Sequence, residues 1–180
     1  EWISPVVLTR RANRELRLCI NLRALNINIL VDSHPLPKSS NLLTMMEGAS
    51  CFSTLDLRNA YNQVKLVRDS RPYTAFITPF GTYQYKRMPF GLASTASVFQ
   101  RAMYHLFKDL YSNGRCFQDD ILVFSKDMDS HLNLLRKVNA RLSQHGLVLS
   151  VEKCKLCKSQ VEILRHTISK EEVTPKSLLV

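Results

Sequence analysis

The hydrophobic residues of this chain recur in two spacings, which predict short strands and longer amphipathic helices. Short apolar runs bounded by polar or turn-forming residues are typical of strands. The runs that predict strands cover residues 5–9, 16–20, 51–56, 73–77, 82–86, 147–151 and 161–168. The runs 73–77 and 82–86 predict a hairpin that turns at Phe80-Gly81.

Two longer segments carry apolar residues three and four positions apart, the spacing of a helix with one buried face. The first covers residues 94–110, and the second covers residues 130–145 and ends at Gly146. A shorter helix is predicted over residues 40–47, between the breaks at Pro37 and Gly48. In the second long helix, the residues predicted to face the core are Leu132, Leu135, Val138 and Leu142.

Strands and helices follow one another without the strict β-α-β alternation that a parallel sheet requires. The pattern therefore predicts an α+β fold, in which helices back an antiparallel sheet. The sequence contains no internal repeat, low-complexity tract or linker, so the 180 residues form one continuous unit.

The composition favours an acidic partner. The chain has 25 Lys and Arg against 15 Asp and Glu, which gives a net charge of +10. Nucleic acid is the commonest partner of so basic a protein, although a well-solvated basic surface explains the same numbers. No apolar run reaches the ~18 residues of a membrane helix, and no signal peptide is present. We therefore expect an intracellular protein, in a cytoplasmic particle or the nucleus, with no membrane partner.

The five cysteines lie mostly inside apolar runs and lack a regular spacing. This pattern predicts reduced core thiols rather than a disulfide framework. Cys154 and Cys157 form a Cys-x-x-Cys pair. A single pair without a second pair or a His-x-His partner is a weak zinc signal.

The most informative polar residues are Asp119 and Asp120, which interrupt an apolar stretch over residues 115–125. Adjacent carboxylates repel each other, and burial penalises each anion unless a cation is bound. Asp56 ends another apolar strand and could meet this pair at one sheet edge. Three such acids suit a two-magnesium phosphoryl-transfer site. The alternative is an ordinary hairpin turn, because Asp favours turns.

Segments spread over nearly the whole chain resemble the motifs of reverse transcriptases from gypsy-type LTR retrotransposons, in the order that the family has them. Any one of them is weak alone, but the ordered set is specific. The segments are 17–26, 53–64, 88–92 with Phe99-Gln100, 119–125, and 145–147 with 152–154.

The resemblance implies the fingers and palm subdomains of a right-hand polymerase within a Pol polyprotein. The implied activity is that of a nucleotidyltransferase, an RNA-directed DNA polymerase. It would use primed RNA or DNA template and deoxynucleoside triphosphates, as a dimer or within a larger polyprotein. The thumb, connection and RNase H parts would be absent. Residues 1–50 and 66–92 would form the fingers, and residues 51–65 and 93–180 the palm.

By the same resemblance, Asp56, Asp119 and Asp120 would be the catalytic residues and would hold two Mg²⁺ ions, with Mn²⁺ able to substitute. The backbone carbonyl of Leu57 would add a ligand. Tyr61 would be the aromatic gate that rejects a ribose 2′-hydroxyl. The other nucleotide-binding residues would be Arg10, Arg17, Asn59, Ala60, Phe90 and Gly91, and the template or primer contacts would be Gln63, Lys86 and Gln100.

Several positions depart from the family pattern. Gln118 stands where an apolar residue is usual, and Arg14 replaces a Gly at a turn where a positive φ is costly for a side chain. Arg165 and Glu172 replace two further glycines. These changes raise the alternative hypothesis of a catalytically inactive, truncated retroelement remnant that at most binds nucleic acid. An ordinary surface or core role remains the alternative for each single site residue.

Overall fold

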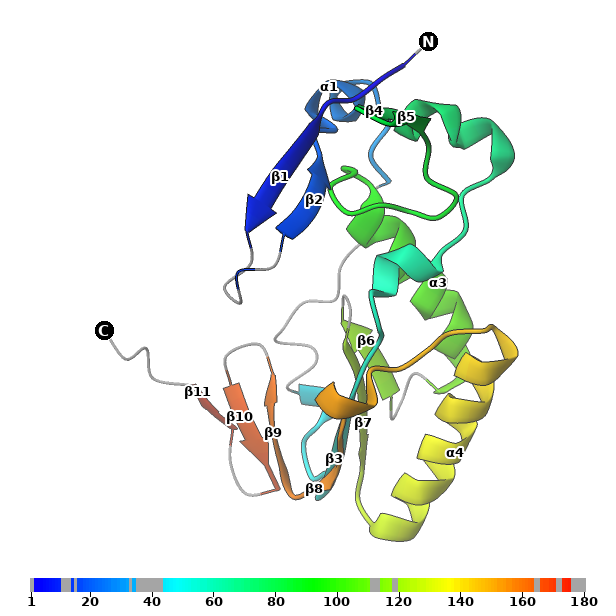
Figure 1. Ribbon diagram of the computed structural model, residues 1–180. Coiled ribbons are helices and arrows are strands. Elements are labelled where there is room, and N and C mark those ends of the chain that lie inside the picture. The colour runs from blue at the N-terminus through cyan, green and yellow to red at the C-terminus, as the bar shows by residue number, and fades with distance from the viewer. Residues whose placement is uncertain are drawn as a thin grey trace. The chain divides into compact units, whose positions relative to one another are not determined.

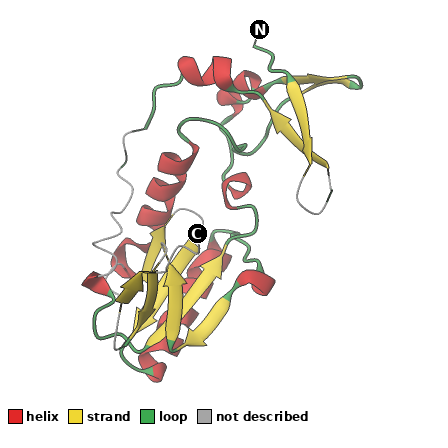
Figure 2. Cartoon of the chain, turned by 90° about the vertical axis from the view of Figure 1, so that its left-hand side faces the viewer, coloured by secondary structure: helices red, strands yellow, loops and turns green. Residues whose placement is uncertain are grey.

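The computed structural model describes residues 2–10, 14, 16–32, 34, 44–110, 114–117, 120–163, 166–170 and 173–175. It forms two compact units. The first contains Glu1–Ser33 and Tyr61–Phe99, and the second contains His34–Ala60 and Gln100–Val180. Antiparallel strands occur in both units together with helices (Figures 1 and 2), which confirms the predicted α+β class. The assignment of residue ranges to fingers and palm stays a prediction.

The first unit begins with a regular antiparallel hairpin. Strands β1 (Val6–Arg10) and β2 (Leu16–Ile20) pair along their whole length, which confirms the two strands predicted there to within one residue. Arg14, in the connection, has a φ of 65°. This is the left-handed conformation that the missing glycine would adopt freely and that an arginine adopts at a cost. The short helix α1 (Arg23–Ile27) follows.

The second hairpin of this unit is shorter than predicted. Strand β4 covers Phe76–Thr78 and β5 covers Gly81–Tyr83, so the turn lies where it was predicted. The prediction was wrong at the outer ends, because Pro72 begins a 3₁₀ turn (Pro72–Thr74) instead of a strand. The Thr74 hydroxyl oxygen accepts the hydrogen bond of Tyr85 N–H at 3.0 Å, in place of a strand partner. A further 3₁₀ turn covers Arg68–Ser70.

A four-stranded sheet in the order β6-β7-β3-β8 is the centre of the second unit. Strand β3 (Cys51–Asp56) was predicted with these bounds. It pairs antiparallel with β7 (Asp120–Ser125), from Cys51 opposite Ser125 to Asp56 opposite Asp120. Strand β6 (Gly114–Phe117) pairs with the other edge of β7, and β8 (Lys155–Lys158) with the other edge of β3.

A three-stranded sheet contains β9 (Gln160–Ile163), β10 (His166–Ser169) and β11 (Val173–Pro175). The single strand predicted over 161–168 is therefore two antiparallel strands. The strand predicted over 147–151 was wrong. Only Leu149 forms an isolated bridge there, and Val151–Lys153 is a 3₁₀ turn.

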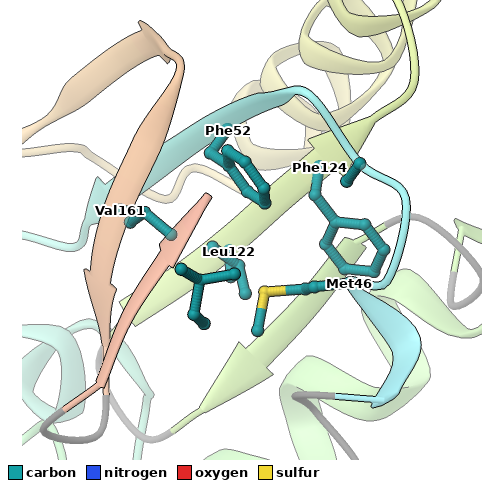
Figure 3. Packing of buried hydrophobic residues seen from close by; sticks show 7 residues of the cluster. Met46, Phe52, Leu122, Phe124 and Val161 are labelled. Atoms are coloured by element: carbon teal, nitrogen blue, oxygen red, sulfur yellow. The ribbon is translucent and has the colours of Figure 1, made fainter. Parts of the chain in front are cut away.

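The core of this unit lies on the face of the central sheet that carries Phe52, Leu122 and Phe124 (Figure 3). Val161 and Ile168 of the smaller sheet belong to the same cluster, and so does Met46. Fully burying such side chains contributes about 1.5–3 kcal/mol each. The helix predicted over 40–47 falls mostly outside the described residues, although Thr44 and Met45 are helical.

The two long helices were predicted with small errors at their ends. Helix α3 covers Thr95–Phe107, followed by a 3₁₀ turn to Leu110. Helix α4 covers Met128–Gln144 and packs against β3 and β7. It begins earlier than predicted because Asp127 caps it, accepting a hydrogen bond from Ser130 N–H at 2.8 Å. Gly146, with a φ of 66°, lies just beyond its end, as predicted.

The buried face of α4 differs from the prediction at its first turns. Val138 and Leu142 are buried as expected, whereas Leu132 is 37% exposed. His131 is fully buried in its place. Two serine hydroxyls of the sheet, Ser53 and Ser125, hydrogen-bond the imidazole, and this partnership makes burial of a polar ring acceptable.

Candidate active site

Two of the three predicted catalytic carboxylates meet across neighbouring strands. Asp56, the last residue of β3, lies directly opposite Asp120, the first residue of β7. Opposed residues of an antiparallel pair project from the same face, with Cβ atoms about 4.5–5.5 Å apart. Asp120 is exposed, and the Asp56 side chain is 23% exposed. The sheet therefore brings two carboxylates to one accessible end.

A cation already lies beside this pair. Lys153 Nζ is 3.5 Å from each carboxylate oxygen of Asp56. Like charges placed directly opposite each other destabilise a sheet, so a positive charge beside Asp56 is stabilising. The Lys153 side chain is 68% exposed, so it can leave the carboxylate at small cost. Lys153 lies in the resembling segment 152–154, but the sequence assigned it no role at this site, because 97 residues separate it from Asp56.

The backbone around Leu57 orients its carbonyl group. Ser150 N–H donates to Asp56 O at 2.8 Å, and Arg58 N–H donates to Val148 O at 3.0 Å. Successive residues of an extended chain direct their polar backbone groups to alternate edges. The Leu57 carbonyl therefore points away from the 148–150 segment, toward the β7 side of β3, where Asp120 lies. Its side chain is buried.

Asp119 and Gln118 lie outside the described residues, so convergence of the third carboxylate with the other two stays a prediction. Phe117 of β6 pairs antiparallel with Asp120 of β7. The described metal-ligand candidates, the carboxylates of Asp56 and Asp120 and the Leu57 carbonyl, are hard oxygen donors at a partly exposed sheet end. Mg²⁺ takes one or two carboxylates and keeps several waters, so these residues fit the ion.

An aromatic cluster surrounds the predicted sugar gate in the first unit. The Tyr61 ring meets Phe90 and Phe99 edge-on, each with a centroid separation of 5.3 Å. Phe99 is fully buried, whereas Phe90 is 42% exposed. Such edge-to-face contacts fix a ring's position. The cluster is therefore a rigid aromatic wall with an accessible rim at Phe90.

The loop that carries Phe90 and Gly91 is clamped by a residue that sequence reasoning missed as a site residue. Asn26 Nδ2 donates to Gly91 O and Asn26 Oδ1 accepts from Ala93 N–H, both at 2.8 Å. Gly91 has a φ of 92°, which favours glycine. A cavity of about 370 Å³ beside this clamp is lined by Gly91, Asn26 and residues 19–23 with Val7. No local pattern reveals a clamp between residues 65 positions apart.

The other predicted nucleotide contacts are placed as follows. Arg10 is exposed near the end of β1, and the backbone of Arg17 pairs with Thr9 in β2, although its side chain is not described. Asn59 is exposed with a φ of 48°, and Ala60 is buried at the start of the 3₁₀ turn Ala60–Gln63.

The three residues predicted to contact template or primer differ in their solvent exposure. Lys86 is exposed and Gln63 is half-buried. The Gln63 carbonyl accepts a hydrogen bond from Arg87 Nη1 at 2.8 Å. Gln100 is 1% exposed, so its surroundings suit a packing role, and its contact with template or primer stays a prediction.

Comparison with known proteins identifies relatives of this chain. The model of a family described as "Reverse transcriptase (RNA-dependent DNA polymerase)" matches residues 10–168. The chain is 31% identical over 181 residues to the retrovirus-related Pol polyprotein from transposon 297 of Drosophila melanogaster, covering 99% of this chain and 17% of that polyprotein. It is 36% identical over 148 residues to the enzymatic polyprotein of cauliflower mosaic virus (strain CM-1841), covering 82% and 22%.

The fold has a solved counterpart. The foamy viral protease-reverse transcriptase, solved in complex with an RNA/DNA hybrid, superposes with a TM-score of 0.86 at 23% sequence identity. The match covers 96% of this chain and 23% of that chain. The right-hand polymerase fold and the resemblance to retroelement polymerases are thereby confirmed. In the described part of the chain, none of the helices has the length and apolar character to cross a membrane.

Proposed function

Because this chain belongs to the reverse transcriptase (RNA-dependent DNA polymerase) family, we propose that it catalyses template-directed addition of deoxynucleotides to a primer 3′-hydroxyl. It would do so on RNA or DNA template as part of a longer Pol polyprotein, since it spans 17% and 22% of the two polyproteins above. The observation that carries the proposal is the register that sets Asp56 opposite Asp120.

The carboxylates of Asp56, Asp119 and Asp120 would hold two Mg²⁺ ions, or Mn²⁺ in their place, with the Leu57 carbonyl as a further oxygen ligand. The ions supply activation of the 3′-hydroxyl and neutralisation of the departing pyrophosphate. The protein's own part is to keep two carboxylates in fixed register, so that little reorganisation is needed. Lys153 would release Asp56 as the ions bind.

The deoxynucleotide would be selected by the aromatic wall. Tyr61, held edge-on by Phe90 and Phe99, cannot yield easily to an additional 2′-hydroxyl. Arg10 and Arg17 would contact the triphosphate, because a guanidinium grips phosphate oxygens in pairs. Asn59, Ala60 and Gly91 would contribute backbone around the same nucleotide.

Nucleic acid is the proposed macromolecular partner. The net charge of +10 supports phosphate binding. Structural relatives were solved with an RNA/DNA hybrid and with double-stranded DNA. Lys86 and Gln63 would contact template or primer. We assign residues 1–50 and 66–92 to the fingers and residues 51–65 and 93–180 to the palm, and propose that the chain acts as a dimer or within its polyprotein.

A second candidate function is that of an inactive remnant that binds nucleic acid. The left-handed conformation of Arg14 favours this candidate. It costs roughly 1–2 kcal/mol, and no contact to another described residue offsets that strain. The two candidates differ in one respect only, the ability to make a phosphodiester bond.

Primer extension on poly(rA)–oligo(dT) with Mg²⁺ or Mn²⁺ tests the proposal. The wild-type chain is compared with Asp56→Asn and Asp120→Asn, which keep size but remove charge. Asp129→Asn is the matched control, since Asp129 is an exposed acid in the first turn of α4. We expect extension by the wild type and the control, and a loss of at least about 100-fold in the two site variants.

Extension that survives both site substitutions would contradict the proposed metal site. Absence of extension from wild-type protein that is folded and binds the duplex would instead support the inactive remnant.

A further inference from the structure

Three metal-ligating side chains converge on the face of the central sheet that α4 covers. They are Cys51 of β3, Cys157 of β8 and His131 of α4, and their ligand atoms all lie within 4.8 Å of one another. Cys51 and His131 are buried, and Cys157 is half-buried. Strand periodicity separates this cluster from the carboxylates, because Cys51 and Asp56 lie five positions apart and so project from opposite faces.

A strained β-bulge places the Cys157 thiol. Strand β8 pairs Lys158 with Phe52 and Lys155 with Thr54, so two of its residues oppose the single residue Ser53. Cys157 occupies the bulge with a φ of 51°. The Cys157 N–H donates to Ser53 Oγ at 2.9 Å. Bulges of this kind re-aim a side chain, and a left-handed non-glycine residue is retained only where its surroundings hold it.

Hydrogen bonds fix the orientation of the His131 ring. Ser125 Oγ donates its only hydrogen to Asp127 O at 2.9 Å. The same oxygen lies 3.0 Å from His131 Nδ1 and must therefore accept the Nδ1–H hydrogen. Burial lowers the pKa of His131, which favours the neutral ring. The lone pair is then on Nε2, which lies 2.7 Å from Ser53 Oγ.

This arrangement has the features of a metal-binding histidine. One ring nitrogen is hydrogen-bonded to a fixed acceptor, and the other offers its lone pair near additional ligands. Two thiols and one imidazole are soft and borderline donors, the set that zinc prefers. Ligands around a tetrahedral zinc lie about 3.5–3.8 Å apart, from Zn–S of about 2.3 Å and Zn–N of about 2.0 Å. Small side-chain movements would shorten the present separations of the three ligand atoms to these values.

We propose that Cys51, Cys157 and His131 bind one zinc ion, with water or the Ser53 hydroxyl in the fourth position. Both thiols lose their protons to solvent on binding, and two Zn–S bonds form. His131 Nε2 gives up its hydrogen bond from Ser53 and binds the zinc ion instead. The ion ties β3, β8 and α4 together behind the sheet. The site is independent of the polymerase proposal, because thiolates select zinc over the hard Mg²⁺ ion.

Zinc titration of the full 180-residue chain tests the site. The protein is stripped with a chelator and kept reduced with a phosphine. We expect one tightly bound ion, release of about two protons per ion, and a tetrahedral thiolate spectrum with Co²⁺ as the probe. Cys157→Gly is the decisive variant, since glycine adopts the φ of 51° without strain and the fold should persist.

The matched control is Cys154→Ser, which removes the other thiol of the Cys-x-x-Cys pair. Cys154 is not among the three clustered ligands. We expect Cys157→Gly and Cys51→Ala to weaken zinc binding by at least about 100-fold, and Cys154→Ser to leave it unchanged. Zinc should raise the Tm of the wild type and of the control, but not of Cys157→Gly. Equal zinc affinity in wild type and Cys157→Gly would overturn the proposal, as would a full loss in Cys154→Ser.

Discussion

Replacing Asn26 with alanine removes both hydrogen bonds that hold the loop carrying Phe90 and Gly91. Each bond is 2.8 Å long, one to Gly91 O and one from Ala93 N–H. A neutral hydrogen bond contributes about 0.5–1.5 kcal/mol net. Because both backbone groups are accessible to water, we use the lower half of that range for each, a loss of about 1–2 kcal/mol for the pair.

Amide hydrogen exchange at Ala93 measures this loss of stabilisation. A local opening made easier by about 1–2 kcal/mol speeds exchange of the Ala93 N–H roughly 5- to 30-fold. Asn26→Asp should preserve protection of Ala93, since a carboxylate still accepts that hydrogen bond, while losing the bond to Gly91. If the loop forms the nucleotide site, both variants raise the KM for deoxynucleotide more than they lower kcat.

Asn28→Ala is the control, because among the described residues the Asn28 side chain donates to the nearby Ala24 O, within the same short helix region. Unchanged Ala93 exchange in Asn26→Ala would refute the clamp. Equal acceleration in Asn28→Ala would show that general loosening of this region, rather than the two specific bonds, is responsible.

Three further predictions follow from the described geometry. The hydrogen bond from Ser130 N–H holds the pKa of Asp127 below its usual range, so the cap stabilises α4 above the unfolded pKa and is lost as pH falls through the folded value. Asp127→Ala should therefore lower the urea midpoint at neutral pH but not in strong acid, and an equal difference at both would contradict this. Lys153→Gln should tighten Mn²⁺ binding about two- to five-fold in a titration, by removing an exposed competing cation, whereas weaker binding would contradict that role. Arg14→Gly should raise the Tm by about 2–8 °C by relieving the left-handed strain, and a fall in Tm would show the arginine side chain to be stabilising.

The strands that carry the carboxylates were predictable because their signal is local. Residues 51–56 form a short run of mainly apolar and β-branched residues, with Ser53 inside it and Asp56 at its end, and β3 has these bounds. The apolar residues after Asp120 give β7 in the same way. Opposition of Asp56 and Asp120 required a pairing register, which a single sequence leaves open. The family resemblance supplied the expectation that these carboxylates lie together, and the observed register sets Asp56 opposite Asp120.

The face of α4 could not be predicted from hydrophobic spacing alone. The rule placed Leu132 inside, but the structure buries His131, because two serine hydroxyls of the sheet satisfy its ring nitrogens. The strand predicted over 147–151 failed for a related reason. Its backbone forms an isolated bridge between Leu149 and Leu57, made by the hydrogen bonds of Val148 and Ser150, and β8 begins later at Lys155. Tertiary partners decided both cases.

The most direct test of the central claim is whether Asp56 and Asp120 hold the same metal ion. Fe²⁺ bound in place of Mg²⁺ cleaves nearby backbone when ascorbate and peroxide are added, and the fragments report the residues around it. We predict cleavage near both residue 56 and residue 120, competed by Mg²⁺ and lost together in Asp56→Asn or in Asp120→Asn. Cleavage near only one of the two residues, or cleavage that persists in either variant, would contradict the account.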